Sequence, residues 1–342
     1  MSAPPGPARR AAGRAAGPDV VTEVAWAYYQ EGRTQRDIAE GLGVSRASVV
    51  NYLAEARARG LVRITLDPDA FTGLSVARAL RDAFGLAAAY VVPDAGEAEA
   101  TFARVARGAA DWLPSLLEPG DRLGLAWGRT MFEMAGMVED RTIPDLTVLQ
   151  LVGSMATPYG FAAEACSTRL AGRLGARCVN LHAPAILSRA ALAAELRREP
   201  VLRDQLAQVA RCGKTIFSVG TVAPDSHIVR SGLATPADLE HYVSEGAAGV
   251  ICGRFVGRDG RAIAGPMDGR MIGVDLERLT RIEAGIMVTP GSDKVGASLA
   301  AIRGGFVTHV VTSDAIAREM LGAVDGEGPR PSPASAAGAG RP

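Results

Sequence analysis

Four short segments of this sequence place glycine beside a hydroxyl or cationic side chain, each directly after an apolar run that is typical of a β-strand. Glycine lets backbone N–H groups approach an anion closely, and a helix that begins at such a turn favours negative charge at its N-terminus. Acting together, these residues would bind a small phosphorylated, hydroxyl-rich molecule. The candidate residues are Gly128, Arg129 and Thr130; Gly153 and Ser154; Gly220 and Thr221; and Gly291 and Lys294.

Lysine is rare in this chain, which draws attention to Lys294. The sequence has 37 lysines and arginines, of which only Lys214 and Lys294 are lysines. Lysine offers a compact ammonium that the planar guanidinium of arginine does not imitate, so a retained lysine is a candidate ligand contact. The alternatives are a coding preference for arginine and, for each glycine alone, a purely structural role in the turn. The hypothesis therefore depends on the four segments meeting at one edge of a sheet.

Apolar, β-branched runs alternate with helical segments from residue 74 onward. This alternation predicts a largely parallel sheet covered on both faces, in a large Rossmann-like α/β domain. Ligands bind such sheets beyond the carboxyl ends of the strands, where the four segments would lie. The expected strands lie in AAAYVVP, DRLGLAW, LTVLQLV, ARCVNL, KTIFSVG, AAGVICGRF, AGIMVTP and FVTHVVTS, and the expected helices include 97–117, 161–174, 189–211 and 294–303.

A different pattern precedes this domain, in the stretch TQRDIAEGLGVSRASVVNYL. Thr34 begins a capping-box pattern that starts one helix, and Ser45 would cap the next. Gly43 between them allows the positive φ of a tight turn. With an amphipathic helix over 19–31 before it, the stretch predicts an N-terminal helix-turn-helix unit. A three-helix bundle of another kind shares the apolar spacing, but rarely both caps and the glycine.

The outward face of the second helix in this stretch carries short polar side chains that suit a DNA major groove. Asn51 can bond an adenine through both amide atoms, and Arg46 can bond a guanine or a phosphate. Arg57, Arg59 and Arg63 follow and suit phosphates, although a solvated surface charge is the alternative for each. The candidate DNA-contacting residues are Thr34, Gln35, Ser45, Arg46, Ala47, Ser48, Asn51 and Arg57.

These patterns divide the chain into five segments. We expect a disordered arm over 1–18, the helix-turn-helix domain over 19–66 ending in a strand within GLVRITL, and a linker over 67–73. An effector-binding and oligomerisation domain would span 74–323, and a disordered tail 324–342. The chain has no apolar run of membrane-spanning length and no secretory signal, so we expect a cytoplasmic protein. The four cysteines lack metal-ligand spacing, and no GxGxxG follows the first strand, so neither a metal nor another cofactor is expected.

Over about residues 20–322 the sequence resembles the SorC (SorC/DeoR-like) family of sugar-binding transcriptional regulators. The resemblance rests on the helix-turn-helix stretch and, in order, on LRDAFGL, GDRLGLAWGRT, HAPAIL, GLATPADLEHYVSEGAAGVICGRF and PGSDKVGASLAAIRGGFVTHVVTSDAIAREML. It implies an effector domain with the fold of sugar-phosphate isomerases, glucosamine-phosphate deaminases and CoA transferases. It further implies phosphosugar effectors, dimers or tetramers and palindromic operators. The family's ligand residues fall on Arg129, Thr130, Gly153, Ser154 and Lys294.

Two positions depart from the family pattern. Val250 stands where the family commonly has an acid, and Gly257 stands where it favours aspartate. Each lost carboxylate removes two acceptors for sugar hydroxyls, so a less hydroxylated effector becomes an alternative.

The resulting interpretation is a DNA-binding regulator of carbohydrate metabolism genes, controlled by a phosphorylated sugar or polyol, and not an enzyme. Repression and activation both stay open. One alternative is a sugar-phosphate isomerase or deaminase with an appended DNA-binding unit, which would need a base such as Asp293 or Asp268. Another is a constitutive DNA-binding protein whose large domain only oligomerises.

Overall fold

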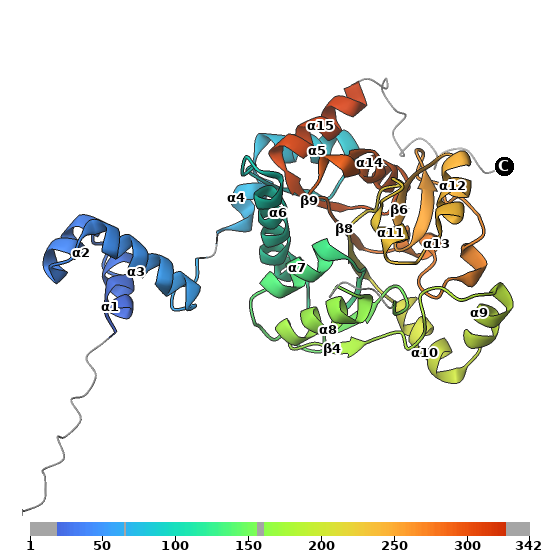
Figure 1. The fold of residues 1–342 in the computed structure, drawn as a ribbon, viewed down its shortest axis with the longest axis horizontal. Coiled ribbons are helices and arrows are strands. Elements are labelled where there is room, and N and C mark those ends of the chain that lie inside the picture. The colour runs from blue at the N-terminus through green and yellow to red at the C-terminus, as the bar shows by residue number, and fades with distance from the viewer. Residues whose placement is uncertain (1–18, 65, 156–160, 326–342) are drawn as a thin grey trace, which may run out of the picture. The chain divides into compact units, whose positions relative to one another are not determined.

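The computed structural model describes residues 19–64, 66–155 and 161–325 of the 342-residue chain (Figure 1). The chain divides into two compact units at the boundary between Leu66 and Asp67. The arm expected over 1–18 and most of the expected tail lie outside the described residues. The tail was expected from residue 324, but the last helix, α15 (Asp314–Asp325), extends two residues into that range.

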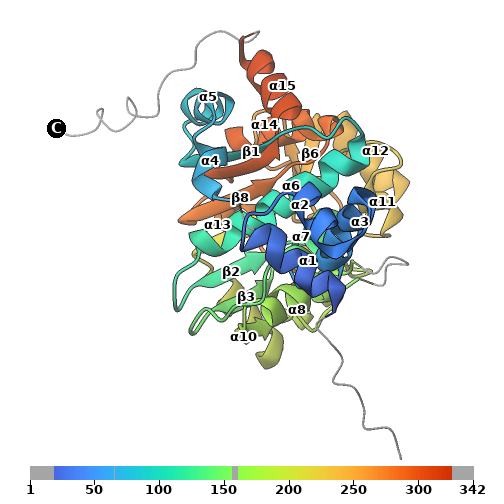
Figure 2. The same ribbon diagram turned by 90° about the vertical axis from the view of Figure 1, so that its left-hand side faces the viewer.

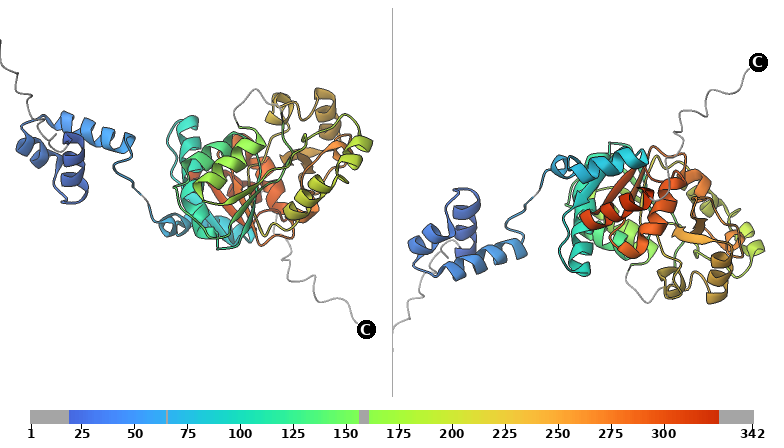
Figure 3. Two further views of the ribbon diagram at one scale, coloured as in Figure 1. Left: turned by 90° about the horizontal axis from the view of Figure 1, so that it is seen from below. Right: turned by 90° about the horizontal axis from the view of Figure 1, so that it is seen from above.

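Three helices form the first unit: α1 (Val20–Tyr29), α2 (Gln35–Leu42) and α3 (Arg46–Ala58) (Figure 3). The predicted caps are confirmed. Thr34 and Asp37 bond each other's backbone N–H in a capping box, and the Ser45 side chain accepts from the Ser48 N–H. Gly43 has a φ of 66°, which ends α2 and allows α3 to turn back across it. The core contains Val24, Ala27, Ile38, Ala39, Val49 and Leu53.

The Thr34 cap leads to a stability prediction. Thr34→Ala removes the acceptor for the Asp37 N–H, so we expect the first unit to lose about 1 kcal/mol of unfolding free energy. Urea titration of the full chain, followed by helical circular dichroism, measures this loss. Thr22→Ala is the matched control because Thr22 lies exposed within α1. An equal effect of the two substitutions would contradict the capping role.

Two expectations for the segment between the units are wrong. The strand expected within GLVRITL is absent from residues 61–64 and 66, because no neighbouring strand in this helical unit takes its hydrogen bonds. The linker expected over 67–73 instead contains helix α4 (Pro68–Thr72), which Asp67 caps. Phe71 of α4 stacks on Tyr90 with ring centroids 5.0 Å apart. The second unit therefore begins at Asp67.

The second unit is built on seven parallel strands, which confirms the predicted α/β fold. The strand order is β1-β9-β8-β5-β2-β3-β4. Most of their residues are buried, as the continuous apolar runs predicted. The strands are β1 (Ala88–Val92), β2 (Arg122–Leu125), β3 (Thr147–Gln150), β4 (Arg177–Val179), β5 (Lys214–Phe217), β8 (Ala284–Val288) and β9 (His309–Ser313).

Helices cover both faces of this sheet (Figure 1 and Figure 2). Helices α6 (Ala98–Trp112), α7 (Arg129–Met137) and α8 (Ala163–Arg173) form one layer. The other layer includes α5 (Ser75–Phe84), α10 (Pro200–Val209), α14 (Val295–Arg303) and α15, with α5 beside α15. Parallel crossovers are right-handed. The order in which successive strands are added to the sheet changes direction between the neighbouring strands β2 and β5. This reversal marks the expected ligand-binding edge.

Two other elements differ from expectation. The run AAGVICGRF forms a separate antiparallel hairpin of β6 (Ala247–Ile251) and β7 (Arg254–Gly257), not one strand of the main sheet. Its turn holds Cys252 and Gly253 at φ values of 49° and 81°. The helix expected over 189–211 is two helices, α9 (Ala190–Leu196) and α10, because a proline can begin a helix but breaks its interior. The remaining short helices are η1 (Leu113–Leu116), α11 (His227–Arg230), α12 (Pro236–Ser244), η2 (Asp268–Arg270), α13 (Leu276–Leu279) and η3 (Ser292–Lys294).

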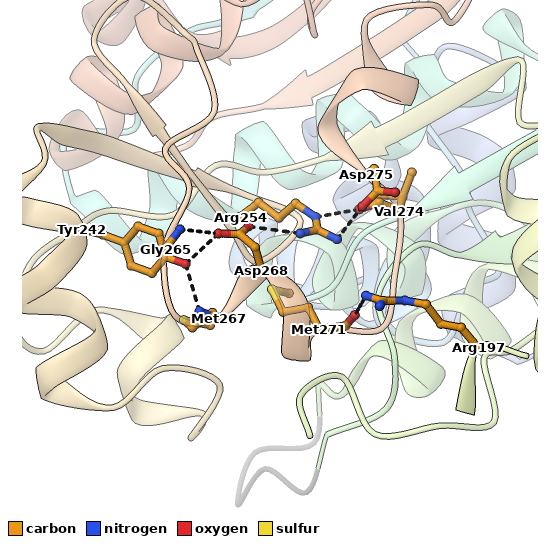
Figure 4. A network of polar contacts seen from close by, with 9 residues as sticks. All are labelled: Arg197, Tyr242, Arg254, Gly265, Met267, Asp268, Met271, Val274 and Asp275. Carbon is orange, nitrogen blue, oxygen red and sulfur yellow. Dashed lines mark hydrogen bonds and ion pairs between the residues drawn. The ribbon is translucent and has the colours of Figure 1, made fainter. Parts of the chain in front are cut away.

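A polar network holds the hairpin against the segment that follows it (Figure 4). The buried Arg254 guanidinium donates to Asp268 at 3.1 Å, to Asp275 at 2.6 Å and to the Val274 carbonyl at 3.0 Å. Asp268 also accepts from the Tyr242 hydroxyl at 2.9 Å. Both oxygens of Asp268 are thus engaged in structural contacts.

This network predicts a stability effect at Asp268. Asp268→Asn weakens charge-assisted bonds from Arg254 and Tyr242, so we expect the free energy of unfolding of the second unit to fall by about 2 kcal/mol. Chemical denaturation followed by tryptophan fluorescence measures the change. Asp259→Asn is the control, since Asp259 is an exposed carboxylate paired only with its neighbour Arg261. Wild-type stability of Asp268→Asn would show that the network does not stabilise the fold.

Candidate functional site

A cavity of about 750 Å³ lies where the strands β2, β5 and β8 end, at the reversal of winding. Three neighbouring strand ends contribute to its lining because parallel strands finish at the same edge. A volume of this size suits a small metabolite. Seven of the nine predicted effector residues line it, namely Gly128, Arg129, Thr130, Gly220, Thr221, Gly291 and Lys294.

The other two predicted effector residues, Gly153 and Ser154, do not line this cavity. The chain beyond β3 bonds to neighbouring loops instead. The Gly153 N–H donates to the Ile272 carbonyl at 2.9 Å, and the Ser154 N–H donates to the Ala183 carbonyl at 2.8 Å. A Cβ on Gly153 would lie 2.8 Å from backbone atoms of Ala185, so this glycine serves close packing.

Arg129 is the first residue of α7 and extends into the cavity lining. Gly128 precedes it with a φ of 111°, a conformation that lets the chain turn from the strand into the helix. The Arg129 guanidinium lies 4.2 Å from the centre of the Phe102 ring and pairs with the Glu99 carboxylate. The aromatic ring and the carboxylate, both from α6, hold this cation at the N-terminus of α7.

Lys294 supplies a second, more buried cation. Burial lowers the pKa of Lys294, and the positive charge of Arg129 lowers it further, while Asp293 acts in the opposite direction. Its ammonium is 3.4 Å from the Ser218 hydroxyl, a long contact. Lys214, the other lysine, is instead bonded to Asp121 at 2.8 Å at the opposite end of β5. Lys294 is therefore the lysine whose charge an anion in the cavity would stabilise.

Several residues of the lining were not predicted. Trp127 lies two residues beyond the end of β2 and directly precedes the Gly128 turn, so its position was a usable signal. Phe161 and His227 lie outside the strand ends, and no local pattern pointed to them. The His227 ring centre is 4.7 Å from that of Trp127 and 5.1 Å from that of Phe161. We call these three rings the aromatic wall.

His227 is an uncharged member of this wall. Burial lowers the pKa of His227 to about 4, and the nearby positive charges of Arg230 and Lys294 act in the same direction. The imidazole is therefore neutral at pH 7. Of the two departures from the family pattern, Val250 belongs to the lining and Gly257 does not.

Only one of the two candidate bases, Asp293 and Asp268, lies in the cavity. Asp293 lines the cavity beside Lys294, whereas Asp268 does not line it. An enzymatic reaction in this cavity would consequently have to use Asp293 or another lining group. Among the described residues, no group of His, Cys, Asp and Glu side chains is arranged to hold a metal ion. None of the described helices has the length and apolar character needed to cross a bilayer.

Helix α3 presents the predicted DNA-contacting face. Val49 and Leu53 are buried, while Arg46, Ala47 and Asn51 are exposed. Ser48 is half-buried, with its hydroxyl 2.9 Å from that of Ser45, and Thr34 and Ser45 serve as caps.

Arg46 and Arg57 each donate a hydrogen bond to another side chain of the first unit. The Arg46 Nε donates to the Gln35 side-chain oxygen at 3.3 Å, so two predicted contact residues are held together. Arg57 donates to the Tyr29 hydroxyl at 3.2 Å. Arg59 differs, because it pairs with Asp19 and Glu55 within the unit. A phosphate would have to displace these carboxylates from Arg59.

Both the sequence and the fold of this chain match those of known proteins. A family profile described as "Putative sugar-binding domain" matches residues 69–322. YjhU of Escherichia coli K12, an uncharacterized transcriptional regulator, is 36% identical over 309 residues, which cover 89% of this chain and 94% of YjhU. This chain belongs to the SorC family of sugar-binding transcriptional regulators. The regulator is also 30% identical to the transcriptional regulator LsrR of Klebsiella pneumoniae over 310 residues, with 89% of this chain and 93% of LsrR covered.

Solved structures show the same fold as the regulator. The full-length sorbitol operon regulator SorC of Klebsiella pneumoniae superposes with a TM-score of 0.73 at 21% identity, covering 88% of this chain and 98% of SorC. A domain of a protein of Arthrobacter aurescens TC1 described as "a possible sugar-binding transcriptional regulator" has a TM-score of 0.67 at 24% identity, covering 74% of this chain and 98% of that domain. The regulator therefore combines a helix-turn-helix unit with the α/β fold of this family.

Proposed function

We propose that the regulator binds operator DNA through α3 and that a phosphorylated sugar or polyol in the cavity changes its affinity for that DNA. The observation that carries the proposal is Lys294, a half-buried ammonium near Arg129 in a cavity at the sheet edge. An anion would compensate the unfavourable burial of this charge. The phosphate ester of a sugar or polyol supplies such an anion.

The phosphate would be held by backbone as well as by side chains. The N-terminus of α7 begins at Arg129, so its free N–H groups favour negative charge there. Thr130 and Thr221 add hydroxyl groups to the lining, and Asp225 adds a carboxylate that can accept from a sugar hydroxyl. The cavity thus contains donors for a phosphate and acceptors for part of a polyol.

On the DNA side, α3 would enter the major groove. Ala47 is small and exposed, which lets the helix backbone approach the base edges. Asn51 suits an adenine and Arg46 a guanine or a phosphate. Val50, which sequence reasoning did not select, is 44% exposed and would suit a thymine methyl group.

We further propose that the regulator acts as a dimer or tetramer on palindromic sites. One recognition helix contacts only a few base pairs, so two copies related by symmetry are needed to define a long operator. An effector that favours one assembly geometry would alter the spacing of paired α3 helices. The size of that shift is limited by the effector's differential affinity for the two geometries.

The cavity would serve as a receptor and not as a catalytic centre. Asp293, the one of the two candidate bases that lines the cavity, adjoins Lys294, whose ammonium is placed for an anionic ligand. Incubating the protein with sugar phosphates and following products by nuclear magnetic resonance separates the two functions. Turnover that depends on Asp293 would support the enzyme instead.

A mobility-shift experiment tests the main proposal. The DNA upstream of the neighbouring genes is titrated with the full-length protein, with and without a set of phosphorylated pentoses, hexoses and polyols. We expect sequence-specific binding and a change in affinity with at least one compound. A protein that binds no such DNA, or whose binding responds to none of the compounds, would contradict the proposal.

A further inference from the structure

The exposed face of α3 carries few groups that can form hydrogen bonds. The buried residues of this helix are Val49, Leu53 and Ala56. Its exposed residues, all of which the structure describes, are Arg46, Ala47, Val50, Asn51, Ala54, Arg57 and Ala58. Apart from one amide and two guanidinium groups, the exposed side chains that α3 offers to DNA are therefore small and apolar.

Most polar side chains of α3 lie at the edges of this face. Successive residues of an α-helix are rotated by about 100°, which places Arg46 and Arg57 together along one edge. Both are already bonded to other side chains of the first unit. Ser48 and Glu55 lie half-buried along the other edge, where Glu55 pairs with Arg59. Among the described residues of α3, the centre of the face thus contains one hydrogen-bonding side chain, which is an amide.

Each base presents a different edge in the major groove, and each edge suits a different side chain. Guanine is bonded by arginine or lysine, and the amino group of cytosine by a carboxylate. Adenine is bonded by asparagine or glutamine, and the methyl group of thymine packs against an apolar side chain. The centre of the α3 face therefore suits adenine and thymine, and its one acid, Glu55, is directed to Arg59 instead of a cytosine.

Ala47, Val50 and Ala54 surround Asn51 on the surface of the helix. The neighbours in this group are three or four positions apart, which brings their Cβ atoms to about 5–6 Å from one another. Successive bases of one DNA strand rise by about 3.4 Å, so the four side chains span a few adjacent base pairs. A thymine methyl group against an apolar side chain is removed from water, which favours binding.

We propose that α3 recognises a half-site of adjacent A·T pairs, in which Asn51 bonds an adenine while Ala47, Val50 and Ala54 pack against thymine methyl groups. This inference rests on the DNA-binding function proposed above and names the class of sequence that is recognised. Arg46, at the edge of the face, adds a phosphate contact or one guanine at the end of the half-site.

Replacing thymine by uracil tests the inference, because uracil pairs in the same way and lacks only the methyl group. Duplexes are first selected with the full-length protein from a pool with about 25 randomised base pairs, enough for two half-sites one helical turn apart. Uracil is then placed at the thymines of the selected half-sites, and affinity is measured by fluorescence anisotropy at fixed salt. We expect about fourfold weaker binding for each contacted methyl group that is removed.

Uracil placed between the half-sites is the control, and it should leave the affinity nearly unchanged. Half-sites dominated by G·C pairs would overturn the inference. So would uracil duplexes that bind as tightly as the thymine duplexes, or that weaken binding equally at the control positions, since the latter effect would arise from DNA deformability.

A variant connects the methyl groups to the helix. Val50 is 44% exposed, so Val50→Ala should fold normally and yet lose part of the uracil effect, because the shorter side chain no longer reaches the methyl group. Val201→Ala is the matched control, since Val201 is a 67% exposed valine on α10 of the second unit. A uracil effect of the same size in Val50→Ala and Val201→Ala would overturn the contact assigned to Val50.

The selection step separates this inference from the proposed function. If no sequence is enriched and no duplex binds more tightly than a scrambled one, the DNA-binding proposal itself is wrong. If a sequence is enriched and bound specifically, but its half-sites are G·C-rich or insensitive to uracil, only the A·T inference is wrong.

Discussion

Lys294→Ala is expected to abolish the response of DNA binding to phosphorylated effectors. Removing one partner of a buried contact between unlike charges typically costs about 3 kcal/mol, which corresponds to roughly a hundredfold loss of effector affinity. The fold itself should not be destabilised, because the substitution removes an ammonium that is already poorly solvated and makes only a long contact to Ser218. Effector titrations monitored by mobility shift and by calorimetry measure both quantities.

Two further variants sharpen this experiment. Arg261→Ala removes a cation that is 90% exposed and does not line the cavity, so the effector response should be that of the wild type. Lys294→Arg retains the charge but introduces a larger planar group, so we expect only partial recovery of affinity. An intact response in Lys294→Ala would remove Lys294 from the effector site.

Arg46→Ala combined with Asn51→Ala is expected to weaken operator binding by roughly a hundredfold, since each base contact contributes about 1–3 kcal/mol. Both side chains are exposed, and Asn51 lies away from the buried stripe of Val49 and Leu53. Thermal stability should therefore change little. Fluorescence anisotropy at fixed salt, with an operator and a scrambled duplex, measures affinity and specificity together.

Arg36→Ala is the matched control for this double variant. Arg36 is an exposed arginine on α2 that pairs with Glu40, and it lies outside the predicted contact set. We expect it to reduce affinity by less than about threefold, as for one lost nonspecific charge. If Arg36→Ala and the double variant have equal effects, α3 does not read the bases.

The helix-turn-helix unit was predictable because its signals are local. The caps at Thr34 and Ser45 and the positive φ of Gly43 each depend on a few neighbouring residues. The main sheet was predictable for a related reason, since buried parallel strands need continuous apolar runs. The hairpin of β6 and β7 escaped prediction because Cys252, a residue without glycine's freedom, adopts a positive φ in its turn.

The cavity was only partly predictable. The turns at Gly128, Gly220 and Gly291 follow neighbouring strands β2, β5 and β8, so strand order brings them together. Gly153 has the same local pattern, but its backbone bonds to the loops around Ala183 and Ile272. That difference arises from tertiary contacts, which sequence spacing does not contain. The same holds for the aromatic wall, whose rings come from three separate segments.

The early start of the second unit limits how far each DNA-binding unit can reach. Because α4 is anchored by the stacking of Phe71 on Tyr90, only residues 61–66 connect Gly60 to Asp67. The seven residue steps from Gly60 to Asp67 span at most about 25 Å, even when fully extended. In the oligomer proposed above, the arrangement of the large domains would therefore set the separation of operator half-sites. A small rotation between protomers would then move two α3 helices out of phase with the DNA helical repeat.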